Sequence, residues 1–391
     1  MATKILDIDL GGSSAPQSGL EGYSAALFLL RAEGRPVGKV TVAVTDGQTS
    51  LRALQRAIPD ASVALAAVTA WRKRLAPPLP PLSLSATVAI CTRERPDDLR
   101  RALASLTLPA PQGQEILVID NCPATDATRQ VTAEFPGARY VVEPVKGLDN
   151  ARNRAVAEAR TEVLAFIDDD AVADPDWLAE LVRPFADARV QCVTGLTMPL
   201  ELETLAQERF ESLSGFSMRG FHAREFRTPR NNPLIVGDVG AGVNMAIRLA
   251  IVPEIGLFDP ALDAGTATQS GGDHEYFTRI LKTGQIIAYS PHALNWHRHR
   301  RSWDELHRAL WGYGVGVYAA WTSTFLATRD WGVFRCAFGW LWHDQLPELW
   351  RAWRRPSSEK PLDILWVQMR GCARGPFAYL EARKRAQEGK E

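Results

Sequence analysis

The sequence contains few cysteines, and none of them form a recognisable pair. Five cysteines are spread over 391 residues, and no two stand in a CxxC spacing. Small disulfide-stapled domains and zinc sites need closely spaced or evenly paired cysteines. This pattern argues against a disulfide scaffold or a zinc site, and it suits a reducing compartment.

An excess of charge of one sign is also missing. Lys+Arg and Asp+Glu number 45 each. Nucleic-acid-binding proteins usually carry a basic excess, so no nucleic-acid partner is expected. The first residues, MATKILDIDL, lack the apolar stretch of a secretory signal, and we therefore expect a cytoplasmic location.

Two phosphate-binding motifs are absent as well. No GxGxxG follows the first strand of the repeating pattern described below, and GxxxxGK[ST] occurs nowhere. The glycines of these motifs let backbone N–H groups approach phosphates closely. A Rossmann dinucleotide site and a P-loop are therefore both disfavoured.

The chain is long enough for two or three folding units. Residues 25–44 read as two strands around the turn EGRP, and helical patterns follow at 51–58 and 63–75. Residues 76–85 (APPLPPLSLS) contain four prolines, which fit neither a helix interior nor a central strand. We predict a small α/β module over residues 1–75 and a linker over 76–85.

Apolar strands alternate with helices from residue 86 onward. The predicted strands are ATVAIC (86–91), EILVID (115–120), RYVVEP (139–144) and TEVLAFID (161–168). The predicted helices are RPDDLRRALASL (95–106), DATRQVTAEF (126–135), LDNARNRAVAEAR (148–160) and DPDWLAELVRPF (174–185). In the last helix we expect Asp174 at the N-cap and Pro175 at the first helical position.

This alternation predicts an α/β fold with a mainly parallel sheet covered by helices on both faces. Ligands bind beyond the carboxyl ends of the strands in such sheets. The four strands lead into the polar segments CTRER, DNCP, EPVKG and DDDA. A polyanion or nucleotide site is expected at that edge.

Three consecutive acids, Asp168, Asp169 and Asp170, follow the last of these strands. Side chains alternate along a strand, so Asp168 and Asp170 should share a side and Asp169 should point away. Two carboxylates on one side suit Mg²⁺ or Mn²⁺. The alternative is that the acids only cap the next helix, but Asp174 is expected to fill that role.

Several ordered segments together resemble the family 2 inverting glycosyltransferases of GT-A fold. They are VAICTRERPDDLRRAL, ILVIDN, KGLDNARNRAV, LAFIDDDAVADPDWL, GAGVNMAIR, GLFDPAL, GGDHEYFTRILKTG and NWHRHRR. The resemblance covers roughly residues 86–310. It implies a catalytic domain over 86–302, followed by a helical region over 303–391. It also implies a nucleotide diphosphate sugar as donor, Mg²⁺ or Mn²⁺ as cofactor, and a sugar or glycolipid as acceptor.

The resemblance assigns roles to individual residues. Asp120 matches the carboxylate that accepts a hydrogen bond from the nucleotide base, and Arg152 matches an arginine near the base and phosphates. The implied donor-binding set is Thr92, Arg93, Arg95, Asp120, Arg152, Asp168, Asp169 and Gly272. The implied metal ligands are Asp168, Asp170 and His297. Asp273 matches the general base.

This sequence departs from the family pattern at three positions. Gly272 stands where the family has a glutamate before the catalytic aspartate. Glu275 replaces the commoner aspartate, so its acceptor contact is an open expectation. Asn121 in DNCPATD stands where an acid is commoner, and it is not expected to do an acid's work.

Further residues have both a structural and a functional interpretation. The segment NWHRHRR reads either as a solvated basic loop, or as the metal ligand His297 followed by phosphate contacts from His299, Arg300 and Arg301. The glycines at 271–272 are either turn residues or positions of close approach to sugar and acceptor. Asn244 could satisfy core backbone groups or touch the donor.

The C-terminal region differs in composition from the rest of the chain. Ten of the twelve tryptophans lie at or after Trp296. Residues 309–328 carry no charge, but their glycines and hydroxyl residues make a weak membrane-span signal. Residues 331–355 mix tryptophan and phenylalanine with arginine, which favours an amphipathic helix in a membrane interface. The alternatives are packing on the catalytic domain, a dimer contact and a true membrane span.

The sequence therefore predicts a metal-dependent inverting glycosyltransferase that is cytoplasmic and peripheral at the inner face of the membrane. Its acceptor hydroxyl would belong to a lipid-linked or polysaccharide acceptor. One alternative is a sugar-1-phosphate nucleotidyltransferase, which normally needs a Gly-rich phosphate loop that CTRERPDD does not supply. The other is a non-catalytic nucleotide-sugar-binding protein.

Overall fold

A computed structural model describes residues 2–12, 17–75, 84–106, 114–354 and 361–389. Most of the predicted linker lies outside these residues; only Leu84 and Ser85 of it are described.

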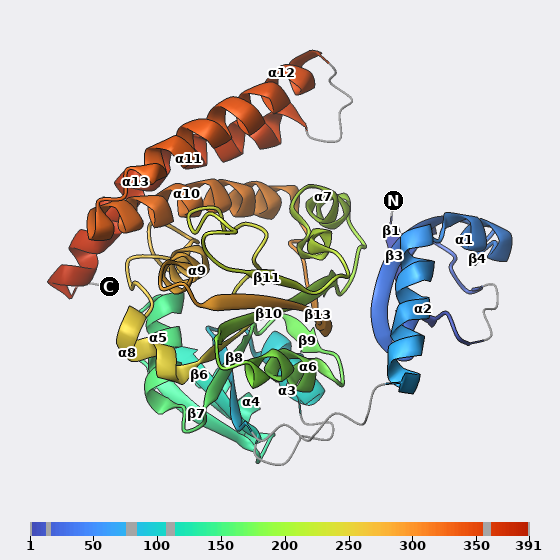
Figure 1. Cartoon of the computed structure of the whole chain (residues 1–391), viewed down its shortest axis with the longest axis horizontal. Helices are drawn as coiled ribbons and strands as arrows, with labels where there is room; N and C mark the ends of the chain where they lie inside the picture. Colours follow the sequence, from blue (N-terminus) through green and yellow to red (C-terminus); the bar gives the residue numbers. More distant parts are fainter. Residues whose placement is uncertain (1, 13–16, 76–83, 107–113, 355–360, 390–391) are drawn as a thin grey trace.

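The N-terminal module, residues 2–75, is a four-stranded sheet with two helices (Figure 1). Its elements are β1 (Ala2–Asp9), β2 (Tyr23–Ala32), β3 (Arg35–Thr45), β4 (Gln48–Thr49), α1 (Leu51–Ala57) and α2 (Asp60–Leu75). The predicted hairpin is present, since β2 and β3 pair antiparallel. Glu33 and Gly34 form its turn with φ of 54° and 81°.

The main sheet contains nine strands among the described residues. They are β5 (Ala86–Thr92), β6 (Gln114–Asn121), β7 (Ala138–Glu143), β8 (Val163–Ile167), β9 (Ala171–Ala173), β10 (Val190–Pro199), β11 (Arg224–Phe226), β12 (Asn244–Arg248) and β13 (Ile286–His297). Their order is β11-β13-β10-β12-β8-β5-β6-β7, and β9 pairs with β13.

The sheet is parallel in the half that the sequence pattern covered. Strands β7, β6, β5 and β8 pair parallel to one another, as expected. The other half is mixed, because β12 runs antiparallel to both β8 and β10, while β10 and β13 are parallel. The short strands β9 and β11 both pair antiparallel to β13.

Helices cover both faces of this sheet (Figure 1). The α-helices are α3 (Pro96–Leu106), α4 (Ala127–Ala133), α5 (Leu148–Glu158), α6 (Trp177–Val182), α7 (Leu205–Ser214), α8 (Val252–Ile255) and α9 (Gly272–Lys282). Short 3₁₀ turns are η1 (Arg183–Ala186), η2 (Phe216–Arg219) and η3 (Leu249–Ile251).

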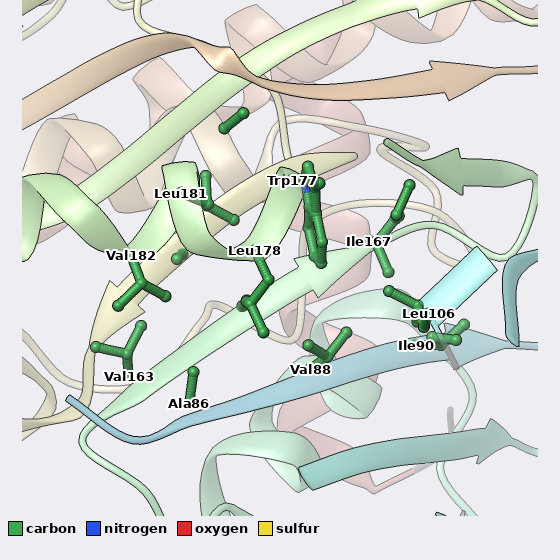
Figure 2. Packing of buried hydrophobic residues seen from close by; sticks show 14 of the residues in the cluster. Ala86, Val88, Ile90, Leu106, Val163, Ile167, Trp177, Leu178, Leu181 and Val182 are labelled. Atoms are coloured by element: carbon green, nitrogen blue, oxygen red, sulfur yellow. The ribbon is translucent and has the colours of Figure 1, made fainter. Parts of the chain in front are cut away.

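One hydrophobic core lies between α3, α6 and the sheet. Figure 2 shows Trp177 and Leu178 of α6 lying over β8 and β5, near Ile167 and Val88. The Trp177 indole N–H donates to Asn244 Oδ1 at 2.9 Å. Asn244 in turn donates to the carbonyls of Leu196 and Ala293. Asn244 therefore satisfies buried backbone groups, which decides between its two interpretations.

Helices form the rest of the C-terminal region, above the main sheet in Figure 1. They are α10 (Trp303–Thr328), α11 (Gly332–Trp340), the π-helical turn η4 (Leu341–Gln345), α12 (Leu346–Arg354) and α13 (Leu362–Glu388). A capping box between Ser302 and Glu305 starts α10.

Gly314 of α10 and Gly371 of α13 let these two helices pack closely. A Cβ on Gly314 would lie 2.3 Å from the carbonyl oxygen of Gln368, and one on Gly371 would lie 2.3 Å from that of Trp311. The uncharged run 309–328 is thus an internal helix of this layer. Within the described part of the chain, no helix is both long and apolar enough to cross a membrane.

Three ion pairs join the N-terminal module to the catalytic domain. They are Arg31–Asp174 at 2.5 Å, Arg35–Glu180 at 3.1 Å and Lys39–Glu211 at 2.8 Å. The expectation for Asp174 was therefore wrong. The N-cap of α6 is Asp176, and the Asp174 side chain instead binds Arg31 from a distant part of the sequence.

Candidate active site

The loops after β5, β6, β7 and β8 meet at one edge of the sheet, as predicted. Thr92 Oγ1 donates to Asp169 Oδ2 at 2.7 Å, which ties the end of β5 to the loop after β8. Asn121 donates to the carbonyl of Val145 and accepts from Gly147 N–H, which ties the end of β6 to the loop after β7. Asn121 therefore holds the loop after β7 against the end of β6.

Asp168, Asp170 and His297 come together as a candidate metal site. One ligand atom from each lies within 4.8 Å of the others. His297 Nε2 lies 3.1 Å from Asp170 Oδ1. The pairing of β9 with β13 explains the arrangement, because Ala171 is opposite His297 and so brings the acidic loop to the end of β13. Two carboxylates and an imidazole form a donor set that fits a divalent cation.

Asp169 faces away from this group. Its carboxylate accepts from Thr92 and from Arg95 Nη1 at 3.1 Å, so it braces the loop. Burial and the nearby Asp170 charge raise the pKa of Asp169 to about 7. The alternation predicted from the sequence thus separates Asp169 from its two neighbours, although the strand itself ends at Ile167.

The other two acids sit in different electrostatic surroundings. Burial and the Asp170 charge raise the pKa of Asp168. Burial also opposes ionisation of Asp170, but His297, Arg300 and Arg95 outweigh it and hold the pKa of Asp170 well below its usual range. Arg95 and Arg300 reach Asp170 Oδ2 at 3.2 Å and 3.5 Å. These two arginines partly neutralise the acidic loop.

Asp273 lies at the N-terminal end of α9. Its two oxygens accept from Gly242 N–H and from its neighbour His274 N–H, both at 2.8 Å. Burial opposes ionisation of Asp273, but the charges of His274 and Arg152 and these two donors lower its pKa. The carboxylate is therefore ionised at neutral pH and is able to accept a proton.

Arg152 lies between the acidic loop and Asp273. Its Nη1 binds Asp149 Oδ1 at 2.8 Å and Asp263 Oδ2 at 2.7 Å. Although burial works in the opposite direction, the pKa of Arg152 is raised well above its usual value by Asp263, Asp149, Asp273 and Asp168. Two carboxylates already pair with its charge. Arg152 therefore organises the acidic groups, and its contact with the base and phosphates stays a prediction.

Asp149 was missed in the sequence. Its buried Oδ2 makes no hydrogen bond to any described residue. A Cβ on Gly272 would lie 2.0 Å from that oxygen. The Asp149 carboxylate thus fills the space beside Gly272, where we had expected the sugar donor. The sequence feature that could have identified Asp149 is its position three residues before Arg152, which places both side chains on one helical face.

Asp120 is buried at the end of β6, as the resemblance implied. Its Oδ2 accepts from Tyr140 at 2.8 Å, whereas Oδ1 finds no partner among the described residues. Burial raises the pKa of Asp120. An unpaired buried acceptor is costly, so a ligand N–H would be favourable at this oxygen. Nearby, Arg93 is exposed and its Nε reaches the carbonyl of Cys122 at 3.4 Å.

The basic segment 297–301 divides into separate roles. Arg300 stays beside Asp170, with its side chain 41% exposed. His299 is buried, and its Nε2 lies 3.1 Å from Glu211 Oε2. Arg301 pairs with Glu201 and Glu203 at 2.7 Å and 2.6 Å. The expected phosphate contacts of His299 and Arg301 are therefore corrected, since other partners occupy both side chains.

A polar chain links this segment to the N-terminal module. His299 Nδ1 lies 3.3 Å from His297 Nδ1, and Glu211 Oε1 accepts from Lys39 Nζ at 2.8 Å. This chain of polar contacts therefore leads from Asp170 through His297, His299 and Glu211 to Lys39. Sequence reasoning could not find it, because Lys39 lies more than two hundred and fifty positions before His297.

Glu275 has a structural role that is separate from the role of Asp273. It is buried and pairs with Arg279, one turn along α9, at 2.7 Å. Arg279 also binds the carbonyls of Ile255 and Leu257. Glu275 lies two positions after Asp273 in the sequence, which places the two side chains on different faces of the helix. The expected acceptor contact is replaced by this structural ion pair.

Residues 87–248 match the profile of the family described as "Glycosyl transferase family 2". This part of the chain belongs to that family. The match contains β5 to β8, the acidic loop and Arg152, whereas Asp273 and His297 lie beyond it.

The family 2 domain has curated relatives of modest identity. The chain is 27% identical over 241 residues to the pre-mycofactocin glycosyltransferase of Mycobacterium tuberculosis, covering 58% of this chain and 46% of that protein. It is 25% identical over 253 residues to glycosyltransferase AglE of Haloferax volcanii, covering 63% and 75%. The chain thus spans less than half of the first relative's length.

A solved structure shares the fold of the family 2 domain and its surroundings. It is the mannosyltransferase PcManGT from Pyrobaculum calidifontis, in complex with GDP-Man and Mn²⁺. The TM-score is 0.50 at 17% identity, covering 83% of this chain and 95% of that chain. This similarity supports the GT-A fold.

Proposed function

We propose that this protein transfers a sugar from a nucleotide diphosphate sugar to an acceptor hydroxyl with inversion at the anomeric carbon. The observation that carries the proposal is the placement of two groups around Arg152. The charges of Asp168, from the cation-ligand set Asp168, Asp170 and His297, and of the ionised Asp273 both act on Arg152.

Asp168, Asp170 and His297 would hold the cation. When bound, a divalent cation neutralises the diphosphate and helps it leave. Mn²⁺ and Mg²⁺ both accept carboxylate oxygens, and the imidazole in the set favours the transition metal. Arg300 is a partly exposed cation beside this site, and we propose it as a phosphate contact.

Asp273 would act as the general base. Its lowered pKa leaves it ionised, and its oxygens are held by two backbone donors. It would accept the proton of the acceptor hydroxyl as that oxygen bonds to the anomeric carbon and the bond to the diphosphate oxygen breaks. Attack opposite the leaving group inverts the configuration.

The nucleoside would lie over the ends of β5 and β6. Asp120 Oδ1 is a buried acceptor without a partner among the described residues, and a base N–H would be its ligand donor. Thr92 and Arg93 follow at the neighbouring strand end. Thr92 also holds Asp169, so its contribution to donor binding would include positioning the acidic loop.

We propose a lipid-linked or polysaccharide acceptor at the inner face of a membrane. A further relative supports this class by its name, the succinoglycan biosynthesis protein ExoM of Rhizobium meliloti. It is 25% identical over 230 residues, covering 55% of this chain and 67% of that protein. The aromatic C-terminal helices described below give the second line of support.

The decisive variant is Asp273→Asn. It keeps the shape of the side chain and removes the base, so transfer should fall by about 10² to 10⁴-fold. Mn²⁺-dependent binding of nucleotide, measured by calorimetry, should stay within about two-fold, because Asp273 is not among the proposed cation ligands. A matched control is Asp187→Asn, at an exposed aspartate paired with Arg189.

Transfer retained in Asp273→Asn would remove this residue as the base. A second assay separates the alternative enzyme class, by incubating a panel of nucleotide sugars with Mn²⁺ and without acceptor. Slow release of nucleoside diphosphate supports sugar transfer, whereas release of pyrophosphate from a nucleoside triphosphate and a sugar phosphate would indicate a nucleotidyltransferase. Binding without either release would indicate a nucleotide-sugar-binding protein.

A further inference from the structure

Helices α11 and α12 are joined through η4 into one helical segment that presents a row of large apolar side chains to solvent. The row is Trp331, Phe334, Phe338, Trp342, Leu346, Trp350 and Trp353. Each of these residues is between 38% and 72% exposed. Their spacing of three or four residues places them on a single face of the helix. This row is called the aromatic stripe below.

The opposite face of the same segment is already packed. Val333 and Ala352 are 5% and 3% exposed. Trp340 stacks on Tyr318 and meets the edge of Trp321, both from α10, with ring centroids 5.9 Å apart in each case. The helix therefore has a packed inner face. Trp331 and Phe334, at the start of the aromatic stripe, also contact Phe325 of α10, whereas the rest of the stripe is additional to this packing.

We propose that the aromatic stripe lies in the interface of a lipid bilayer that carries anionic headgroups. Exposed apolar rows of this size are rare on the surface of proteins that meet only water. A helix with an aromatic face and basic flanks is the type that lies flat at the boundary between headgroups and acyl chains.

The charges beside the aromatic stripe fit an anionic surface. Arg335, Arg351 and Arg354 are exposed within residues 331–354, all of which the structure describes. Asp344 is the only exposed acidic residue in that range. The Arg354 guanidinium lies over the Trp350 ring, 4.0 Å from its centroid. Arginines in these positions can bind headgroup phosphates while the neighbouring rings enter the interface.

The tryptophan N–H groups favour lipid over a second copy of this chain. The buried indoles of Trp177 and Trp321 donate hydrogen bonds within the protein. The four tryptophans of the aromatic stripe make no such bond to any described residue. A dry contact between two identical stripes would leave these donors without acceptors, at a cost for each one. The headgroup region offers acceptors to the N–H and an apolar layer to the ring.

The position of the segment also suits a flat surface. Residues 332–354 form a helical row of roughly 35 Å at 1.5 Å per residue. Figure 1 places α11 and α12 in the outer layer, beyond α10 and away from the sheet. The inner face of the segment meets α10, as the rings of Trp340, Tyr318 and Trp321 demonstrate.

Helix α10 connects this layer to the site of sugar transfer. A Cβ on Gly271 would lie 2.4 Å from the carbonyl oxygen of Gly316 in α10, and Gly271 is two residues before Asp273. A bilayer bound along the aromatic stripe would therefore hold lipid-linked hydroxyl groups on the α10 side of Asp273. This last step rests on the proposed function, whereas the binding of lipid does not.

The experiment uses the full chain and sedimentation with vesicles. One set contains phosphatidylcholine alone, and the other contains phosphatidylcholine with phosphatidylglycerol. The test variant is Trp342→Ser combined with Trp350→Ser. The matched control is Trp71→Ser, at an exposed tryptophan of α2 in the N-terminal module. Thermal melting of all proteins verifies that each is folded.

The wild-type chain and Trp71→Ser should bind the anionic vesicles, with a blue shift of tryptophan fluorescence. The double variant should bind at least about ten-fold more weakly, because two interfacial rings are lost. High salt should weaken binding of the wild-type chain. Release of nucleoside diphosphate without acceptor should be equal in all three proteins, which separates a failure of docking from a failure of the enzyme.

Two results would overturn the proposal. The first is a wild-type chain that stays in the supernatant with anionic vesicles. The second is a wild-type dimer by light scattering that the double variant loses, since the aromatic stripe would then be an interface between two copies of this chain.

Discussion

At the scale of single residues, three neighbouring aspartates differ in role and in ionisation because their surroundings differ. Asp170 is held ionised by His297 and two arginines. Asp169 is tied to Thr92 and Arg95, where burial raises its pKa to about 7. Asp168 shares the ligand set with Asp170, but burial and the Asp170 charge outweigh His297 and Arg152 and raise its pKa. Repulsion within the acidic loop is thus offset by His297, Arg300 and Arg95 around Asp170, and by Arg95 at Asp169.

The variant Asp170→Asn should test the proposed cation binding by Asp170 separately from the loop contacts made by Asp169. The change removes one anionic ligand of the proposed set, so Mn²⁺ affinity should fall by about 10- to 100-fold or more. Electron paramagnetic resonance of free Mn²⁺ measures this without any turnover. Asp97→Asn, at an aspartate whose side chain is 86% exposed, is the control. Equal Mn²⁺ affinity in both variants would count against the cation site.

At the scale of elements, the catalytic site depends on how closely the N-terminal ends of α5 and α9 approach each other. Asp149 comes from the first turn of α5, and Gly272 is the first residue of α9. The Asp149 carboxylate occupies the position that a side chain at 272 would need. The departure from the family pattern at Gly272 therefore has a structural reason: a carboxylate from another helix fills that place.

Gly272→Ala should destabilise the fold, although alanine is the better helix former. The new Cβ would lie 2.0 Å from Asp149 Oδ2, and overpacking of this kind costs about 1–3 kcal/mol. The gain in helix propensity is at most about 1 kcal/mol. Gly339→Ala in α11 is the matched control, because its Cβ meets nothing within 4 Å. Urea unfolding of both variants should shift in opposite directions; a stabilised Gly272→Ala would contradict the packing argument.

The sequence predicted elements well where the pattern was local. Hydrophobic runs located β5 to β8, and the acids after β8 located the candidate cation site, because strand alternation and chain order were enough. The sequence did not predict contacts between residues that are far apart in the chain. Asp174 has the composition and position of an N-cap, yet Arg31 of the N-terminal module binds it. His299 reads as a surface basic residue, yet Glu211 and Phe210 enclose it. Long-range pairs of this kind have no signature in one sequence.

The same distinction applies to the helical region. An uncharged run with three glycines was ambiguous, because a glycine signals close packing only when the partner helix is known. The structure supplies α13 as that partner of α10. The aromatic residues of 331–354, in contrast, carry their periodicity in the sequence, and the expected amphipathic helix is present. Its exposed face could be assigned only once the packed face was known.

At the scale of the whole molecule, the catalytic domain lies between two added parts that contact it differently. The helical region packs on it through α10, next to the loop before Asp273. The N-terminal module contacts it through ion pairs and through the hydrogen bonds of Thr3 with Leu202 and Glu208. One of the ion pairs, Lys39–Glu211, is the outer end of the polar chain that leads to His297. The module is therefore placed to influence the cation site.

We predict that Lys39→Met lowers Mn²⁺ affinity while the fold is retained. Partners behind a metal-binding histidine fix its ring orientation, and their loss typically costs about 10- to 100-fold in affinity. Lys39 acts through Glu211 and His299, so a smaller loss of several-fold is expected. Arg35→Met is the matched control, since it breaks a different ion pair of the same module, with Glu180, outside the polar chain. Calorimetric titration with Mn²⁺ should separate the two variants, and Lys39→Arg should restore most of the affinity by keeping the charge beside Glu211. Lys39→Met and Arg35→Met could instead weaken Mn²⁺ binding equally. In that case the module would affect Mn²⁺ affinity only through its overall attachment to the rest of the protein, and the polar contacts through His299 would not be responsible.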